Sequence, residues 1–481
     1  MNREDLARLD ATAQADLVRG GEVTPAELVE AAIERVEATN GEVNAVIHPL
    51  FEEGLEAARG ELPDGPFTGV PFLLKDLGAA FAGQPLHLGM SYLKDRDFRA
   101  PMDTYLAQRF RAAGLVTIGK TNAPELGILP TTEPRAHGAT RNPWDLERTP
   151  GGSSGGSGAA VAAGMVPMAH ANDGGGSIRI PASNCGLVGL KPSRQRISEG
   201  PLVGDLMSGL TCELCVSRSV RDTAALLEAV HGPAPGDPYV APPPSRPYTE
   251  EVGADPGRLR IGLWTETIIE QDADPEVVAA ASAAAKLLEG LGHQVEEPDM
   301  SVLQSMPIIE PFLVRWAAGQ AQALDQFGII GGQPIGPDDV EPLTWALAEI
   351  GRARSAGEYL AAVGLHQAMG RVFAGVHESG FDLLLTPTMG EPPPPLGSFD
   401  DSGPDPMDAF HRAFIAGCFT AAFNATGQPA ISLPLHWTDD GLPVGVQLVA
   451  PLGREDLLLR VAAQLEQAAP WADRTAPTFA A

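Results

Sequence analysis

The stretch from Thr149 to Ser198 reads TPGGSSGGSGAAVAAGMVPMAHANDGGGSIRIPASNCGLVGLKPSRQRIS. It holds two clusters of glycine and serine, GGSSGGSG at 151–158 and DGGGS at 173–177, which a short apolar segment joins. Glycine permits close backbone approaches that any Cβ would block, and consecutive N–H groups in such turns can converge on one negative charge. A serine beside such donors is a candidate nucleophile. The stretch therefore indicates acyl transfer.

A flexible linker is the simplest alternative for a segment rich in glycine and serine. The flanking sequence argues against it. AAVAAGMVPMA at 159–169 is apolar and rich in Ala and Val, and IRIPASNCGLVGLKP at 178–192 has the composition of buried chain. We therefore interpret the whole stretch as part of the protein interior.

Helices and strands alternate along much of the chain. The run TPAE at 24–27 combines a hydroxyl cap, a proline and a glutamate in the pattern of a helix start, and predicts a helix over 25–38. Residues 233–257 and 389–408 are rich in proline and polar groups and are expected to be surface loops. Further elements are expected as a helix over 275–289 and strands at 260–264, from 294, and at 381–386, 429–434 and 444–449. This alternation predicts an α/β fold.

Two short motifs match other enzyme classes. GLVTIGKT at 114–121 fits the pattern of a phosphate-binding loop, but its interior is an apolar, β-prone run where that loop needs exposed N–H groups. GSSGG at 152–156 fits the nucleophile elbow of α/β-hydrolases, but the preceding DLERTP is no strand. His170 lies near the glycine clusters and is expected to be a packed or hydrogen-bonded histidine rather than a base. Both motifs are therefore set aside.

A serine nucleophile needs a base within hydrogen-bond reach. Lys75 is the candidate, because it ends the apolar run VPFLL at 70–74 and burial would lower the pKa of its ammonium group, leaving a neutral amine. A lysine after a strand is more often simply solvated. The residues alone leave both interpretations of Lys75 open.

Composition and charge exclude several partners. With 44% hydrophobic and 20% charged residues the chain is typical of a globular protein, and a net charge of −29 argues against nucleic acid. The chain has too few cysteines for disulfide bonds to stabilise a protein of this length, and they are expected to be structural: Cys185, Cys212, Cys215 and Cys418. No secretory signal and no apolar run of the roughly 18 residues that a membrane span needs is visible. A cytoplasmic location without membrane contact is expected.

The glycine-rich stretch and six other segments resemble the amidase signature family. Its members carry GGSSGGS, then D-x-GGSIR-x-P, then CG-x-VG-x-KP, and these pieces stand here at 151–157, 173–181 and 185–192. The other segments, in family order, are GVPFLLKD at 69–76, GKTNAPELG at 119–127, NPWD at 142–145, FDLLLTPT at 381–388, TGQPAISLP at 426–434 and DGLPVGVQLV at 440–449. The resemblance implies one compact α/β domain over 1–481, with core motifs at 69–198. Its large, mixed, twisted β-sheet is expected to carry helices on both faces.

The resemblance also implies the roles of the site residues. The family uses a Ser–cis-Ser–Lys triad, which on this chain makes Ser177 the nucleophile, Ser153 the bridging serine and Lys75 the general base. The expected oxyanion donors are the backbone N–H groups of Gly174, Gly175, Gly176 and Ser177. The expected supporting residues are Ser154, Asp173, Arg179 and Gly152, with a cis peptide between Gly152 and Ser153. No metal ion and no cofactor is expected.

One departure from the family pattern is visible beside the nucleophile. Many members read D-T-GGS or D-I-GGS, whereas this chain has Gly174 after Asp173, and the missing side chain is expected to widen or loosen the acyl site. HANDGGGSIRIPAS at 170–183 resembles the branch that contains 6-aminohexanoate cyclic-dimer hydrolases and related broad amidases. The resemblance therefore implies hydrolysis of linear or cyclic amides, with 6-aminohexanoate amides as candidates.

Two other functions stay open. The first alternative is an amidotransferase-type subunit that releases ammonia for a partner. The second is a non-catalytic binding protein on the same scaffold. The pocket for a small, apolar amide is expected to draw on the loop after Gly127 and on the more variable region at about 300–420. There, Pro307 to Trp316 and Trp345 form either a core stripe or a substrate wall. A homodimer is the candidate assembly.

Overall fold

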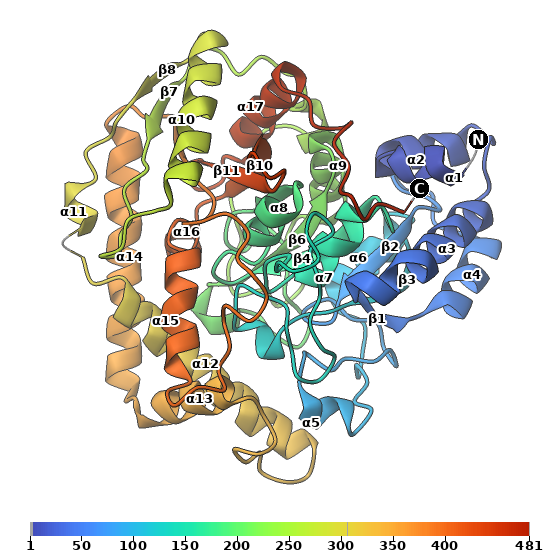
Figure 1. Ribbon diagram of the computed structural model, residues 1–481, viewed down its shortest axis with the longest axis horizontal. Helices are drawn as coiled ribbons and strands as arrows, with labels where there is room; N and C mark the ends of the chain where they lie inside the picture. The colour runs from blue at the N-terminus through green and yellow to red at the C-terminus, as the bar shows by residue number, and fades with distance from the viewer. Residues whose placement is uncertain (1–2, 305, 481) are drawn as a thin grey trace.

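An eleven-stranded mixed β-sheet runs through the molecule (Figure 1). The computed structural model describes residues 3–304 and 306–480. Strand order across the sheet is β1-β3-β2-β4-β6-β5-β10-β11-β9-β7-β8. β2 runs parallel to β3 and β4, and β7 runs parallel to β8 and β9, whereas the other neighbours are antiparallel. The strands are β1 (Val46–Pro49), β2 (Pro71–Lys75), β3 (Val116–Thr121), β4 (Met168–Asp173), β5 (Val188–Lys191), β6 (Cys212–Ser217), β7 (Arg260–Leu263), β8 (Gln294–Glu296), β9 (Leu383–Pro387), β10 (Ala430–Trp437) and β11 (Pro443–Val449).

Helices cover both faces of the sheet. In β5, Gly189 faces Ala182 of α8, so the next residue, the buried Leu190, points to the opposite face, where α9 and α17 pack together. The α-helices are α1 (Arg3–Arg8), α2 (Ala11–Arg19), α3 (Pro25–Val43), α4 (Phe51–Arg59), α5 (Ser91–Lys94), α6 (Tyr105–Ala112), α7 (Gly155–Ala162), α8 (Arg179–Cys185), α9 (Val220–Val230), α10 (Pro275–Gly290), α11 (Ser301–Gln304), α12 (Ile309–Ile330), α13 (Pro342–Ala353), α14 (Ala356–Glu378), α15 (Met407–Ala416), α16 (Ala421–Thr426) and α17 (Glu455–Ala468). Short 3-10 turns are η1 (Glu125–Gly127), η2 (Leu206–Ser208) and η3 (Tyr248–Glu250).

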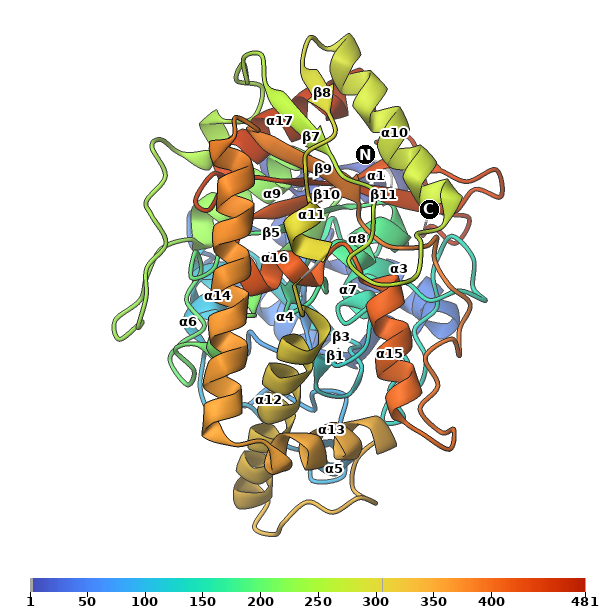
Figure 2. The same ribbon diagram turned by 90° about the vertical axis from the view of Figure 1, so that its left-hand side faces the viewer.

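A layer of helices, α12 to α16, extends beyond the sheet (Figure 2). α12 packs against α13 and α14, α13 against α15, and α14 against α16. Apolar side chains of this layer form a core cluster with Leu384 of β9 and Val449 of β11, which joins the layer to the sheet. The sheet and the helical layer thus form a single compact α/β domain, as the sequence predicts.

The local sequence patterns predict most of these elements correctly. The helix expected over 25–38 is α3, whose first turn has the capping box of Thr24 and Glu27. It continues to Val43 and ends where Asn44 adopts a left-handed conformation, with φ 52°. The other expected elements correspond to α10, β7, β8, β9, β10 and β11. Residues 233–257 contain only η3, and 389–408 have no regular element before α15 begins.

The structure also agrees with the rejection of the phosphate-binding loop and of the nucleophile elbow. The interior of GLVTIGKT is strand β3 and no helix follows it directly, and residues 145–150 before GSSGG form no strand. No helix among the described residues is long and apolar enough to cross a membrane.

Candidate active site

The two glycine clusters lie at the starts of two buried helices. The first cluster leads into α7 and the second follows β4 and leads into α8. The peptide between Gly152 and Ser153 is cis, as expected. A Cβ on Gly152 would lie 2.3 Å from the carbonyl oxygen of Thr131, so only glycine fits there. This close packing holds Ser153 beside the loop at 127–131.

Lys75 is completely buried at the end of β2. Its Nζ donates to Ser153 Oγ at 2.7 Å and to Asn172 Oδ1 at 2.6 Å. Burial lowers the pKa of Lys75 to about 7, although the negative charges of Glu213 and Asp173 act in the opposite direction. The lysine is therefore not solvated, and a large fraction of it is a neutral amine at pH 7.

Ser177 lies at the wall of a pocket and is 8% exposed. Among the described residues, no hydrogen bond connects its Oγ to Ser153 or to another side chain. The structure thus brings Lys75 and Ser153 into direct contact and leaves the Ser177 hydroxyl unengaged next to open space.

An ion pair inside the protein holds the loop that carries Ser177. Asp173 and Arg179 are both completely buried, and their atoms approach to 2.9 Å. Burial alone would raise the pKa of Asp173, but the Arg179 guanidinium outweighs it and lowers the pKa to about 2. Asp173 also accepts from the N–H groups of Gly176 and Ile178 at 2.7 and 3.2 Å. Asp173 is therefore charged and fixes the turn.

The same contacts reduce the set of oxyanion donors expected from the sequence. Because Gly176 N–H already donates to Asp173, it is not free to meet a developing oxyanion. The N–H groups of Gly174, Gly175 and Ser177 make no hydrogen bond within the described residues. Three of the four expected donors are thus available.

Gly174 does not widen the site, which corrects the expectation from the sequence. A Cβ at this position would lie 3.1 Å from the indole ring of Trp316, and one on Gly175 would lie 3.2 Å from the ring of Phe312. These two rings of α12 stack on each other with centroids 5.2 Å apart. The space that the missing side chain leaves is therefore filled by aromatic rings.

The pocket at Ser177 has an empty volume of about 470 Å³, part of it open to solvent. It lies between the loop after η1 and the helices α12, α15 and α16, in the regions from which the sequence predicts the pocket. Figure 2 shows where these three helices lie. Trp316 is a wall residue, whereas Trp345 packs in another core cluster. Apolar groups dominate the lining, which comprises Gly127, Ile128, Leu129, Pro130, Gly175, Ser177, Ile180, Phe312, Trp316, Phe410, Ala413, Phe414, Gly417 and Ala421.

Several residues of this site were not anticipated. Asn172 accepts from Lys75 and donates to the carbonyl of Leu77 at 2.9 Å, and Ser154 Oγ exchanges hydrogen bonds with the backbone of Asn172. Asn424 donates to Asp173 at 2.8 Å. The position of Asn172, directly before Asp173 at the end of a strand, could have indicated that it belongs to the site. Asn424 is distant in the chain, and no feature of the sequence around it indicated a place in the site.

His170 and the cysteines are structural, as expected. His170 is completely buried, its Nδ1 accepts from the backbone of Lys75 at 3.2 Å, and its Nε2 lies 2.6 Å from Glu213. All four cysteines are buried free thiols. Burial raises the pKa of Cys212, next to the site on β6, to about 11, so the thiol is not a reactive thiolate.

Known proteins resemble this chain over nearly its whole length. The Amidase family profile matches residues 27–459. The 6-aminohexanoate-cyclic-dimer hydrolase of Pseudomonas sp. (strain NK87) is 47% identical over 98% of this chain and 97% of its own length. A structure of 6-aminohexanoate cyclic dimer hydrolase has a TM-score of 0.94 and 45% identity, covering 98% of this chain and 99% of that one. A structure of such a hydrolase complexed with substrate has a TM-score of 0.93, with 44% identity and the same coverage.

These matches define the class of protein. The chain belongs to the amidase family, and it is a hydrolase that acts on amide C–N bonds of small molecules. In sequence and in fold it is similar to 6-aminohexanoate cyclic-dimer hydrolases.

Proposed function

We propose that this chain hydrolyses amides through an acyl-enzyme on Ser177, with Ser153 and Lys75 as its proton relay. One observation carries the proposal. The completely buried Lys75 donates to Ser153 Oγ at 2.7 Å, beside the pocket that Ser177 lines. A buried lysine whose pKa is about 7 is a suitable base for a hydroxyl, because its neutral form is well populated at physiological pH.

In the proposed reaction, Lys75 takes the proton of Ser153 while Ser153 takes that of Ser177. Ser177 Oγ then bonds to the amide carbon, and the C–N bond breaks as the relay returns the proton to the leaving nitrogen. Water next attacks the ester carbon, releases the carboxylic acid and returns a proton to Ser177 Oγ.

We propose the free N–H groups of Gly174, Gly175 and Ser177 as the oxyanion donors. Removal of one such donor typically reduces the rate by about 10²–10³-fold. Asp173, Arg179, Ser154 and Gly152 are proposed as positioning residues, since they fix the turns that carry the donors and the two serines.

We propose linear or cyclic amides of 6-aminohexanoate as the substrate class. Two observations support it. The pocket at Ser177 is lined mainly by apolar and aromatic groups, which suits the methylene chains of such amides. The relatives with 47% identity and the structures with TM-scores of 0.93 and 0.94 are hydrolases of the 6-aminohexanoate cyclic dimer.

The catalytic roles are tested with a fluorophosphonate serine probe, read by intact mass and peptide mapping. We expect a single adduct on Ser177 in wild type, none in Ser177→Ala and slow labelling in Lys75→Ala. Amide hydrolysis should fall by at least about 10⁴-fold in each variant, because triad members act as a unit. Ser402→Ala, on the exposed loop before α15, is the control and should label like wild type. Labelling of Ser154, or undiminished labelling without Lys75, would contradict the triad.

The substrate class is tested by kcat/KM on a panel of amides. The cyclic dimer and linear oligomers of 6-aminohexanoate are compared with short aliphatic amides and anilides. A kcat/KM on every 6-aminohexanoate amide at least about tenfold below that on another class would overturn the substrate and leave the triad intact.

Three expectations remain predictions. A subunit that supplies ammonia to a partner would copurify with that partner and show little amidase activity alone. Light scattering on the purified protein tests the homodimer. Cell fractionation of the source organism tests the cytoplasmic location.

A further inference from the structure

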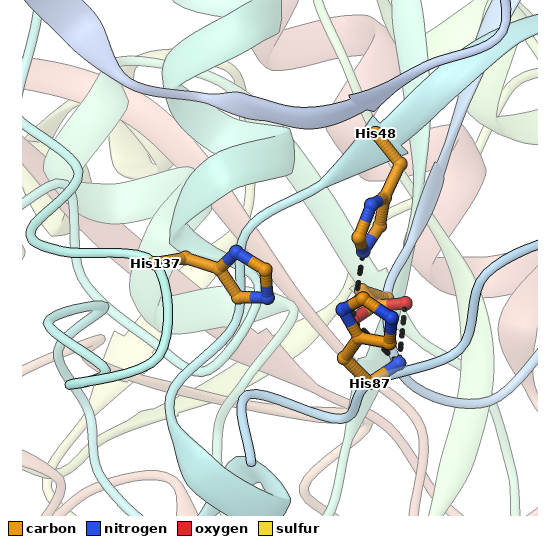
Figure 3. A group of neighbouring side chains, drawn as sticks. His48, His87 and His137 are labelled. Carbon is orange, nitrogen blue, oxygen red and sulfur yellow. Dashed lines mark hydrogen bonds and ion pairs between the residues drawn. The ribbon is translucent and has the colours of Figure 1, made fainter. Parts of the chain in front are cut away.

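Three histidines that are far apart in the sequence meet at one place in the fold (Figure 3). His48 belongs to β1, His87 follows β2 in a loop, and His137 lies in the loop between η1 and α7. Figure 3 shows the rings of His48 and His137 directed towards His87. The ring centroids of His48 lie 4.4 Å from those of His87 and 5.3 Å from those of His137.

Four of the six ring nitrogens of this cluster make no hydrogen bond within the described residues. They are Nε2 of His48, Nε2 of His137 and both ring nitrogens of His87, and all four are buried. Nε2 of His48 has only the Asp76 carboxylate as an ion-pair partner, at 3.6 Å. His87 is only 6% exposed. Buried polar groups in folded proteins are almost always hydrogen-bonded, so four such nitrogens at one place require an explanation.

One carboxylate faces the cluster. Asp76 Oδ2 lies 3.6 Å from His48 Nε2, and one atom from each of the three histidines and Asp76 lies within 4.8 Å of all the others. Asp76 already accepts from the backbone N–H groups of His87 and Leu88 and pairs with Lys120 at 2.9 Å. The Asp76 carboxylate oxygens therefore already have partners. Asp76 contributes negative charge beside the three histidines and helps to orient His48.

We propose that His48, His87 and His137 form a binding site for one divalent transition-metal ion of the zinc class. Imidazole nitrogen is a preferred donor for Zn²⁺, whereas Mg²⁺ and Ca²⁺ select oxygen ligands. Three protein nitrogens leave one position of a tetrahedral ion for water, as Zn²⁺ sites with three histidines commonly have.

The geometry needs only a small adjustment for this ion. With Zn–N distances of about 2.0–2.1 Å, tetrahedral ligand atoms are separated by about 3.4 Å. The ligand atoms here lie within 4.8 Å of one another, so the two half-buried rings, His48 and His137, must rotate inward to reach these distances. The ion would satisfy ring nitrogens that the protein leaves unpaired.

The role of the ion follows from the elements that it connects. The three histidines come from an edge strand and two long loops, and Asp76, which they surround, directly follows Lys75. Lys75 itself turns to Ser153 and Asn172 and not to the histidines. The ion is therefore structural. It connects β1 and the two loops near the end of β2, and it takes no part in the hydrolysis.

The proposal is tested by titrating Zn²⁺ into full-length protein that has been treated with a chelator and desalted, with binding measured by calorimetry. The variants are His48→Gln, His87→Gln and His137→Gln. The matched control is His411→Gln, which removes an exposed histidine of α15. We expect one Zn²⁺ per chain in wild type and control, and affinity reduced by more than about 100-fold in each cluster variant, since loss of even an outer partner weakens a metal site by about 10–100-fold.

Two further readouts keep the outcome unambiguous. Zn²⁺ should raise the Tm of wild type and of His411→Gln but not of the cluster variants, because an ion that binds only the folded state stabilises it. Co²⁺ in wild type should produce the intense visible bands of a tetrahedral ion, which needs no variant to fold. Absence of saturable binding, a weak octahedral Co²⁺ spectrum, or equal binding in cluster variants and control would overturn the proposal.

Discussion

At the scale of single residues, Lys75 combines two opposing influences. Burial favours its neutral form, whereas the charges of Glu213 and Asp173 favour the ammonium. Asp173 is compensated by Arg179 at 2.9 Å, and Glu213 is bound to His170 at 2.6 Å. Glu213 is therefore a residue through which the pKa of Lys75 can be changed without contact with the substrate.

This balance predicts the pH dependence of the reaction. The proposed base acts only when neutral, so kcat/KM should rise with pH through about 7 and then level off, following the pKa of Lys75. Glu213→Gln removes the larger of the two electrostatic effects that favour the ammonium form of Lys75. The pKa of Lys75 then falls further, and the rising limb of the pH profile should move to lower pH. The pH profile of kcat/KM on a neutral amide measures both.

The control for this prediction is Glu289→Gln at the exposed end of α10, which should leave the limb in place. A limb that is unchanged in Glu213→Gln, or that moves to higher pH, would contradict the assignment of Lys75 as the titrating base.

At the scale of elements, the turn between β4 and α8 depends on one ion pair. Arg179 makes two hydrogen bonds to Asp173 and others to Asn424, Gln447 and the carbonyl of Thr420. Thr420 Oγ1 also donates to the carbonyl of Gly175 at 2.7 Å. The turn that carries Ser177 is thus tied to α16 and β11 by buried groups.

Removal of one partner from this pair should destabilise the protein strongly. Arg179→Met leaves the Asp173 carboxylate buried without its counter-charge, and we expect a loss of about 3–5 kcal/mol in the free energy of unfolding, measured by urea denaturation. The matched control is Arg19→Met, which breaks an exposed pair with Asp16 at 2.5 Å. If both variants shift the urea midpoint equally, the buried pair is not what holds the turn.

At the scale of the whole molecule, the distribution of charge is uneven. The chain has 62 acidic and only 33 basic residues, and several of the basic ones are buried, among them Lys75, Lys120, Lys191, Arg179 and Arg315. The surface therefore carries most of the net charge of −29 with few compensating cations. Repulsion among these groups opposes the compact state.

Screening of this repulsion should stabilise the protein. Raising NaCl from about 0.01 M to about 0.1 M shortens the Debye length from about 30 Å to about 10 Å, and the Tm should rise. Differential scanning calorimetry measures the change, and choline chloride at the same concentrations separates screening from specific binding of Na⁺. A Tm that falls with either salt would mean that favourable ion pairs outweigh the repulsion.

The sequence by itself determined the local backbone and the residues at its turns. The capped start of α3, the alternation of strands and helices, and the glycines around Ser153 and Ser177 are properties of short segments, because steric freedom and hydrophobic period act over a few neighbouring residues. The family motifs added the pairing of Lys75 with the two serines, of which the contact between Lys75 and Ser153 is present at 2.7 Å.

Only the tertiary structure decided which distant side chains meet. Trp316 fills the space beside Gly174, Asn424 donates to Asp173, and His48 and His137 converge on His87 from distant parts of the chain. These contacts depend on the order of strands in the sheet and on how the α12–α16 layer packs against it. Neither is encoded in the spacing of any one segment, because packing joins residues whose separation along the chain carries no information about their distance in space.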